Sequence, residues 1–313
     1  MTRAFVFPGQ GSQAVGMGKE LAEAFPVARE VFQEVDDALS QKLSVLMFEG
    51  PENELTLTEN AQPALMAVSL AVTRVLEAEG GFTLTDKCDL VAGHSLGEYS
   101  ALAAAGTFAI ADAARLLKIR GQAMQAAVPV GVGAMAALLG LNYVDAVAVA
   151  EEAAQGDVCT AANDNADGQV VVSGHKAAVE RAIEIAKVKG AKRAVLLPVS
   201  APFHCPLMQP AADRMAEALA SVLMTAPAKP VVANVIAEKT ADPETIRKLL
   251  VEQVCGTVRW RESVLYMKEQ GITNLVELGA GKVLSGMVRR IDRDLTGVAV
   301  NGPADIESFL GTL

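Results

Sequence analysis

The sequence predicts an α/β fold in which a large domain, built on a parallel sheet covered by helices, carries a smaller inserted domain. Three observations lead to this prediction. The chain has 313 residues, which is too many for one small core and suits a large domain with an insertion. Short apolar runs typical of buried strands alternate with longer runs of helical periodicity. Between residues 130 and 199 this alternation gives way to a different order of elements.

The large domain is predicted from both ends of the chain. Before the insertion, the short apolar runs predict strands at residues 4–7 and 90–93. Helices are expected where apolar residues recur three and four positions apart, at residues 19–40, 63–79, 96–105 and 111–126. After the insertion, strands are expected at residues 230–236 and 274–278, and helices at residues 242–253 and 260–270.

The inserted segment reads βαββαβ, which is the order of a ferredoxin-like domain. Its strands are expected at residues 134–139, 158–162, 169–173 and 193–198, and its helices at residues 144–154 and 176–189. Gly131 and Gly133 suit a hinge at its start. We therefore divide the chain into a large discontinuous domain of residues 1–129 and 200–313 and a small domain of residues 130–199.

Composition excludes several classes of function. A net charge of −10 disfavours a nucleic-acid partner, because no basic excess is present to neutralise phosphates. The longest stretch without acidic or basic residues, 121–144, is interrupted by Pro129 and three glycines, so no membrane span is expected. The first residues lack the apolar segment of a signal peptide. Four cysteines without a CxxC pair predict free thiols, no metal cluster and a cytoplasmic location.

Residues 93–97 read Gly-His-Ser-Leu-Gly and lie between an expected strand and an expected helix. In a hydrolase-like fold, glycines on either side of a serine allow the sharp turn that exposes the serine Oγ at the edge of the sheet. The following helix N-terminus directs amides toward an oxyanion formed there. Ser95 is therefore the candidate nucleophile, and the alternative is an ordinary glycine-bounded turn with a capping serine.

A serine nucleophile needs a base, and the chain has three histidines. His94 is adjacent to Ser95 and its side chain leaves the turn in another direction, so we expect it to pack beside the site. His175 lies at the polar start of an expected helix in the inserted domain. His204 remains, in a proline-rich loop where the chain returns to the large domain. No aspartate can be assigned to orient it, so a carbonyl oxygen is the expected partner.

Arg120 lies at the centre of the apolar stripe of the expected helix at residues 111–126. A guanidinium among apolar residues is costly unless it is paired, and its planar fork suits a carboxylate. One interpretation is a buried ion pair with a protein carboxylate, or a side chain that extends outward along its apolar stem. Beside a serine nucleophile, the other is a substrate that carries a carboxylate, such as a short dicarboxylic acyl group.

The glycine-rich turn after the first strand contains Gly9-Gln10-Gly11. It fits a dinucleotide-binding fingerprint only in the looser form, because Ala14 occupies the third glycine position and no acidic residue ends a second strand. The alternative is that the backbone N–H of Gln10 supplies one oxyanion donor, and the N–H of Leu96, directly after the candidate nucleophile, the other.

With these residues identified, the chain resembles the malonyl-CoA:acyl carrier protein transacylases of bacterial fatty acid synthesis. The resemblance rests on seven motifs in family order, at residues 7–13 (FPGQGSQ), 93–102 (GHSLGEYSAL), 120–121, 133–137, 169–174 (QVVVSG), 200–204 and 277–284 (ELGAGKVL). It implies Ser95 as nucleophile, His204 as base, Arg120 as the carboxylate-binding residue, and the amides of Gln10 and Leu96 as the oxyanion hole.

The resemblance also implies two further residues at the substrate side of the site. The carbonyl of Gln253 would orient the histidine, although Cys-Gly-Thr at residues 255–257 departs from the family pattern. Phe203 would narrow the pocket for malonyl over methylmalonyl groups. Malonyl-CoA and acyl carrier protein are the implied partners, with neither a metal nor a cofactor, since CoA and phosphopantetheine thioesters are substrates.

Other functions remain open at this point. An esterase or thioesterase would use the same serine and histidine, a polyketide-pathway acyltransferase would share all the motifs, and a non-catalytic binding module would use only the glycine-rich turn. The acidic chain needs a local basic patch to dock an acidic carrier protein. Two clusters are candidates: Lys187, Lys189, Lys192 and Arg193, and, slightly preferred, Lys282, Arg289 and Arg290.

Overall fold

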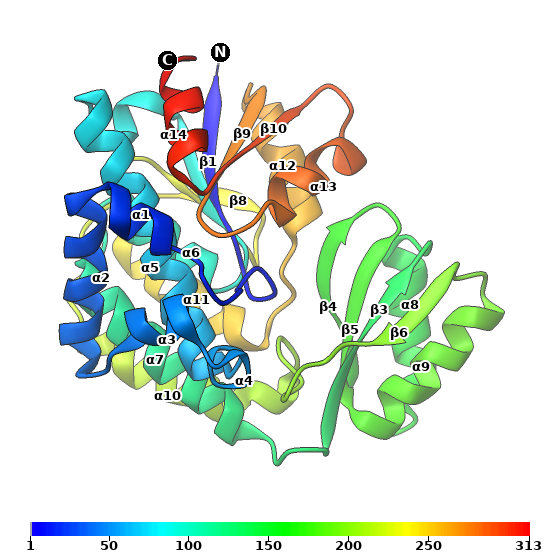
Figure 1. The fold of residues 1–313 in the computed structure, drawn as a ribbon. Coiled ribbons are helices and arrows are strands. Elements are labelled where there is room, and N and C mark those ends of the chain that lie inside the picture. The colour runs from blue at the N-terminus through cyan, green and yellow to red at the C-terminus, as the bar shows by residue number, and fades with distance from the viewer. Residues whose placement is uncertain (1) are drawn as a thin grey trace.

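The computed structural model describes residues 2–313, and a six-stranded sheet forms the centre of the large domain (Figure 1). The strand order is β10-β9-β1-β2-β7-β8. The strands are β1 (Arg3–Phe7), β2 (Leu90–Gly93), β7 (Val231–Ala233), β8 (Glu238–Thr240), β9 (Asn274–Leu278) and β10 (Thr296–Val300). All neighbours are parallel except β7 and β8, so the loops after β1 and β2 leave the same edge of the sheet.

Helices cover both faces of this sheet, as side-chain alternation along β1 requires. Phe5 and Phe7 pack into the larger cluster, and Ala4 and Val6 into the cluster on the opposite face. The larger layer contains α1 (Lys19–Ala24), α2 (Pro26–Leu39), α3 (Leu43–Glu49), α5 (Thr58–Gly80), α6 (Gly97–Ala104), α7 (Ile110–Ala127), α10 (Gln209–Ala220), α11 (Pro243–Cys255) and α14 (Pro303–Leu310), with the short α4 (Glu52–Leu55) beside it. The opposite layer contains α12 (Trp260–Glu269) and α13 (Val283–Ile291).

The small domain has an antiparallel sheet of order β4-β5-β3-β6. Its elements are β3 (Gly133–Leu139), α8 (Tyr143–Ala154), β4 (Cys159–Ala166), β5 (Gln169–His175), α9 (Lys176–Val188) and β6 (Arg193–Leu196). The two helices pack on one face and form a separate core. Met135 and Val171, on the other face, join the core of the large domain. This face therefore covers the edge of the large sheet where the candidate site lies.

The predicted fold class is confirmed, and the strands predicted at 90–93 and 274–278 have the observed bounds. The boundaries at 129/130 and 199/200 stay a prediction. Several predicted elements were wrong in detail. The strand expected at 230–236 ends at Ala233, and the strand expected at 158–162 continues to Ala166. The helix at 19–40 is two helices, because Phe25 is extended and Pro26 begins a new one. The long helix begins at Thr58, five residues before Pro63.

Candidate active site

The backbone around Ser95 forms a sharp turn between β2 and α6. Ser95 has a φ of 53°, in the left-handed region that side chains other than glycine rarely adopt. A Cβ on Gly93 would lie 1.9 Å from the Gly97 carbonyl, and one on Gly97 would lie 2.2 Å from the Phe7 oxygen. Only glycine fits at either position. The turn is further held by Asn234, whose Oδ1 accepts a hydrogen bond from the Ser95 N–H at 2.7 Å.

His204 reaches Ser95 from the loop that returns from the small domain. Its Nε2 lies 2.7 Å from Ser95 Oγ, and its Nδ1 lies 2.8 Å from the Gln253 carbonyl oxygen. A carbonyl only accepts, so Nδ1 carries the proton and Nε2 presents its lone pair to the Ser95 hydroxyl. Burial, followed by the positive charge of Arg120, lowers the pKa of His204 to about 3. The imidazole is therefore neutral at pH 7 and able to accept the serine proton.

Arg120 lies under the nucleophile and is 1% exposed. Its Nη2 donates to Ser95 Oγ at 3.0 Å and to Gln253 Oε1 at 2.9 Å, and its Nη1 donates to Gln62 Oε1 at 2.7 Å. No carboxylate lies within 4.0 Å of the guanidinium among residues 2–313. A buried ion pair with the protein, the alternative interpretation of the sequence, is therefore wrong. The cation is held by neutral oxygens, and burial lowers its pKa.

A cavity of about 600 Å³ opens above these residues. It is lined from the large domain by Gln10, Leu96, Arg120 and Met124 and from the small domain by Met135 and Asn163, with Phe203 and His204 from the return loop. Over the described residues 2–313, the backbone N–H groups of Gln10 and Leu96 have no protein acceptor. Gln10 and Leu96 belong to adjacent loops, so both amides are available to an oxygen beside Ser95.

The structure therefore brings together six of the seven predicted site residues around the cavity. The seventh, Gln253, lies behind the cavity wall and is fully buried. Its carbonyl contacts His204, and its side-chain Nε2 donates to the Ser95 carbonyl at 3.0 Å and to Glu98 at 2.9 Å. Gln253 is therefore placed to orient His204 and Arg120, but it does not line the cavity.

Several polar residues of this network were not identified from the sequence. Gln62 comes from α5, Asn234 follows β7, and Asn165 of β4 accepts a hydrogen bond from His94 Nε2 at 2.8 Å. Glu98 is 1% exposed, and burial raises its pKa to about 7. The one available signal was Glu98, a carboxylate in the first turn of a helix whose other residues are almost all apolar.

The structure also bears on the cysteines, on metal ligands and on membrane-spanning helices. All four cysteines are unpaired. Along residues 2–313, no group of three or more potential ligands is placed to hold a metal ion. In the same part of the chain, every helix is too short or too polar to cross a bilayer.

Known proteins match the chain over almost its whole length. An acyl transferase domain model matches residues 4–302. The malonyl CoA-acyl carrier protein transacylase of Escherichia coli K12 is 48% identical over 307 residues, which are 98% of each chain. The crystal structure of an acyl-carrier-protein-S-malonyltransferase from Bartonella henselae has a TM-score of 0.97 and 58% identity, and the alignment covers 100% of this chain and 99% of that one.

A further solved relative is a malonyl-transacylase in complex with the holo form of a type II PKS acyl-carrier protein. It has a TM-score of 0.96 and 45% identity, with 100% of each chain covered. These identities are far above what a shared fold alone requires, and the alignments leave no large part of the chain unmatched. The resemblance seen in the sequence is confirmed, and the chain belongs to the acyl transferase family, among the malonyl CoA-acyl carrier protein transacylases.

Proposed function

We propose that this chain transfers the malonyl group of malonyl-CoA to the phosphopantetheine thiol of acyl carrier protein through a malonyl ester on Ser95, and so supplies fatty acid synthesis. One observation carries the proposal. Ser95 Oγ lies 2.7 Å from His204 Nε2 and 3.0 Å from Arg120 Nη2. A nucleophile, its base and a cation suited to a carboxylate thus meet at one atom. The names of the Escherichia coli and Bartonella henselae relatives support the same activity.

In the first half-reaction the malonyl group moves from sulfur to oxygen. His204 Nε2 takes the Ser95 proton while Oγ forms a bond to the thioester carbon. The carbonyl oxygen becomes an oxyanion, which accepts hydrogen bonds from the N–H groups of Gln10 and Leu96. When the tetrahedral intermediate collapses, the carbon–sulfur bond breaks, and the proton on His204 passes to the CoA sulfur.

In the second half-reaction the carrier thiol takes the place of CoA. His204 accepts the thiol proton, sulfur attacks the ester carbon, and the carbon–oxygen bond to Ser95 breaks. The proton then returns from His204 to Ser95 Oγ, which restores the free enzyme and predicts ping-pong kinetics. Arg120 pairs with the malonyl carboxylate in both half-reactions. The chemistry uses only side chains and amides of the chain, so we propose that it needs neither a metal nor a cofactor, and that activity survives chelators.

The decisive experiment is the intact mass of the protein after mixing with malonyl-CoA. We expect a stable malonyl adduct on the wild-type chain that is lost in Ser95→Ala, which folds normally because only one hydroxyl is removed. Transfer should fall by several powers of ten, as is usual when a nucleophile is removed. A Ser95→Ala protein that still acylates the carrier at close to the wild-type rate would show that the nucleophile is another residue.

A thioesterase would use the same residues with water as the second acceptor. Release of free malonate, measured beside carrier acylation, separates the two activities. Arg120 favours transfer, because a hydrolase for uncharged acyl groups has no need of a buried, unpaired cation. The relative solved with a polyketide carrier makes such a carrier the second candidate acceptor. Parallel assays with fatty acid and polyketide carriers decide between them. The unpaired cysteines support a reducing, cytoplasmic location.

We propose the second basic cluster as the carrier-docking surface. Lys282, Arg289 and Arg290 are all exposed and form no ion pair with any of residues 2–313. In the first cluster this holds only for Lys192 and Arg193, because Lys187 and Lys189 are paired with glutamates of the small domain. Unpaired cations attract an acidic partner more strongly. Charge reversal at Lys282 and Arg289 should raise the KM for carrier protein in a salt-dependent way and leave malonylation of Ser95 by malonyl-CoA unchanged. Equal damage to both half-reactions would contradict this placement.

A further inference from the structure

The small domain is attached to the large domain by strand β4, directly beside the active site. The Val258 N–H donates to the Ala162 carbonyl at 2.9 Å, and the Asp164 N–H donates to the Val258 carbonyl at 3.0 Å. The Thr257 hydroxyl donates to the Ala161 carbonyl at 2.7 Å. The segment before α12 therefore adds to the edge of the small-domain sheet. This contact passes between two domains that are joined covalently only at the ends of the insertion.

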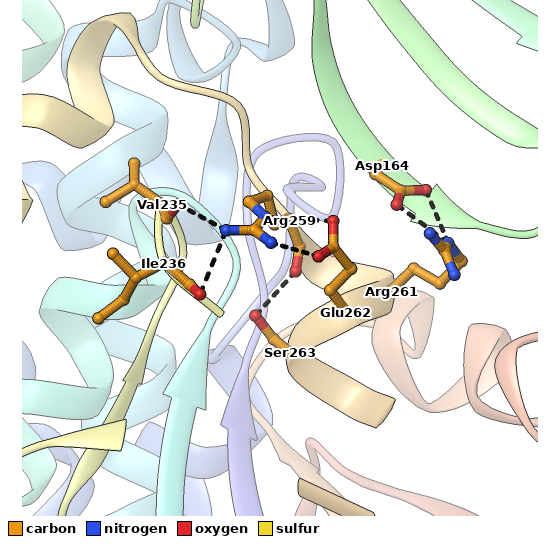
Figure 2. Close-up of polar contacts among 7 residues, drawn as sticks. All are labelled: Asp164, Val235, Ile236, Arg259, Arg261, Glu262 and Ser263. Carbon is orange, nitrogen blue, oxygen red and sulfur yellow. Dashed lines mark hydrogen bonds and ion pairs between the residues drawn. The ribbon is translucent and has the colours of Figure 1, made fainter. Parts of the chain in front are cut away.

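An ion pair reinforces the same contact (Figure 2). Asp164 is fully buried, and its two oxygens lie 2.9 and 3.2 Å from Arg261 Nε in the first turn of α12. Burial raises the pKa of Asp164, whereas Arg261 opposes that change. The start of α12 is itself fixed to the large sheet, because Arg259 donates to the carbonyls of Val235 and Ile236 beyond β7.

The neighbours of Asp164 on β4 contact the site, in a stretch where the pairing of β4 with β5 has two register shifts. Asn163 lines the cavity, and Asn165 Oδ1 lies 2.8 Å from His94 Nε2. The His94 ring in turn packs closely against the glycine-rich turn: a Cβ added to Gly9 would lie only 2.9 Å from His94 Nδ1. A continuous series of contacts thus runs from the ion pair to the turn that carries the Gln10 amide.

We propose that Asp164 and Arg261 are positioning residues for the reaction. Their ion pair holds β4 against α12 and so preserves the hydrogen bond between Asn165 and His94. His94 in turn fixes the positions of Ser95 and of the Gln10 N–H. The nucleophile and the oxyanion hole therefore depend on how the small domain is seated. This inference rests on the proposed function for the roles of Ser95 and Gln10. It adds that the insertion shapes the catalytic geometry in addition to covering the cavity.

The test compares Arg261→Gln with Arg181→Gln. Arg181 pairs with Asp157 at 2.9 Å wholly within the small domain, so its loss removes an ion pair of the same chemistry without touching the contact between domains. Misplacement of reacting groups by about 1 Å costs on the order of 100-fold in rate. We expect Arg261→Gln to lower kcat for Ser95 malonylation by about 10- to 100-fold, with little change in KM, and Arg261→Lys to recover part of the loss.

A second readout keeps the inference separate from the identity of the substrate. The rate at which a fluorophosphonate labels Ser95 depends on the nucleophile, base and oxyanion amides but not on a malonyl group. Arg261→Gln should slow this labelling as well, and so should Asn165→Ala, which removes only the contact with His94. If both rates in Arg261→Gln match those of Arg181→Gln, the ion pair serves stability alone and the inference is wrong. If wild-type protein reacts with the fluorophosphonate but not with malonyl-CoA, the proposed function fails, and labelling alone decides the positioning role.

Discussion

Replacing Arg120 with alanine tests the substrate assignment most directly. The guanidinium has five N–H donors, of which the protein uses three, on Gln62, Gln253 and Ser95. Its Nε is buried and, over residues 2–313, has no protein partner. Two of the five donors are therefore not used within the described chain, and none of its carboxylates lies within 4.0 Å of the guanidinium.

The expected magnitude follows from the burial of this cation. Deleting one partner of a desolvated, charge-assisted pair costs about 2 to 5 kcal/mol. At about 1.4 kcal/mol for each factor of ten, kcat/KM for malonyl-CoA should fall by about 30- to several-thousand-fold in Arg120→Ala. Acetyl-CoA has no carboxylate to lose, so its use should change much less. Arg120→Lys keeps the positive charge without the planar fork, so its kcat/KM for malonyl-CoA should lie between those of the wild type and Arg120→Ala.

The quantity to measure is the ratio of kcat/KM for malonyl-CoA to that for acetyl-CoA, by stopped-flow or by quenched intact mass. The ratio removes any general effect on Ser95, which Arg120 also contacts at 3.0 Å. An unchanged ratio in Arg120→Ala would refute the reasoning. It would mean that the arginine only stabilises the packing of α7 on its neighbours.

Three other changes give sharp expectations. Gly97→Ala would place a Cβ 2.2 Å from a carbonyl oxygen of β1 and should lower the free energy of unfolding, measured in urea, by about 1 to 3 kcal/mol. Gly286→Ala, with no atom within 4 Å of the added Cβ, should raise the free energy of unfolding by up to about 1 kcal/mol. Equal effects of the two substitutions would contradict the steric argument. His204 stays in its basic, neutral form down to its pKa of about 3, so kcat/KM should fall on the acid side only below pH 5. Glu98, with a pKa of about 7, could add a fall at pH 6 to 7. A fall at pH 6 to 7 that survives in Glu98→Gln would contradict the prediction for His204. Gln253→Glu would put a carboxylate where an amide oxygen now lies 2.9 Å from the arginine, and should reduce the preference for malonyl-CoA over acetyl-CoA; an undiminished preference would count against the carboxylate role.

The parts of the site that the sequence predicts are those that leave a local trace. Ser95 is marked by glycines two positions on either side, and the structure shows that each glycine is required by a backbone contact. Arg120 is marked by its place on an apolar helical face and is 1% exposed. His204 is predicted by elimination, because the chain offers only three histidines; the structure places its Nε2 2.7 Å from Ser95 Oγ.

The parts that the sequence does not predict are made by contacts between distant segments. Asn234 lies 139 positions from Ser95, and Asn165 lies 71 positions from His94. A single amide in a short loop or strand has no periodicity that could identify it. Strands β8 and β10 and helices α3, α4, α10, α13 and α14 were not predicted, and the single bridge between β4 and Val258 has no local signal at all.

The network behind Ser95 has a consistent electrostatic logic. A carboxylate in contact with Arg120 would stabilise the buried cation, but it would also compete with the carboxylate of the substrate. The structure instead places the neutral amide of Gln253 between Arg120 and the Glu98 carboxyl group: its Oε1 accepts from Arg120 at 2.9 Å, and its Nε2 donates to Glu98 at 2.9 Å. The Gln253 amide hydrogen-bonds both groups and keeps the guanidinium and the carboxyl group from direct contact. The cation therefore remains costly to bury, and under the proposed function the malonyl carboxylate would pair with it. Burial without a contacting carboxylate accounts for the lowered pKa of Arg120.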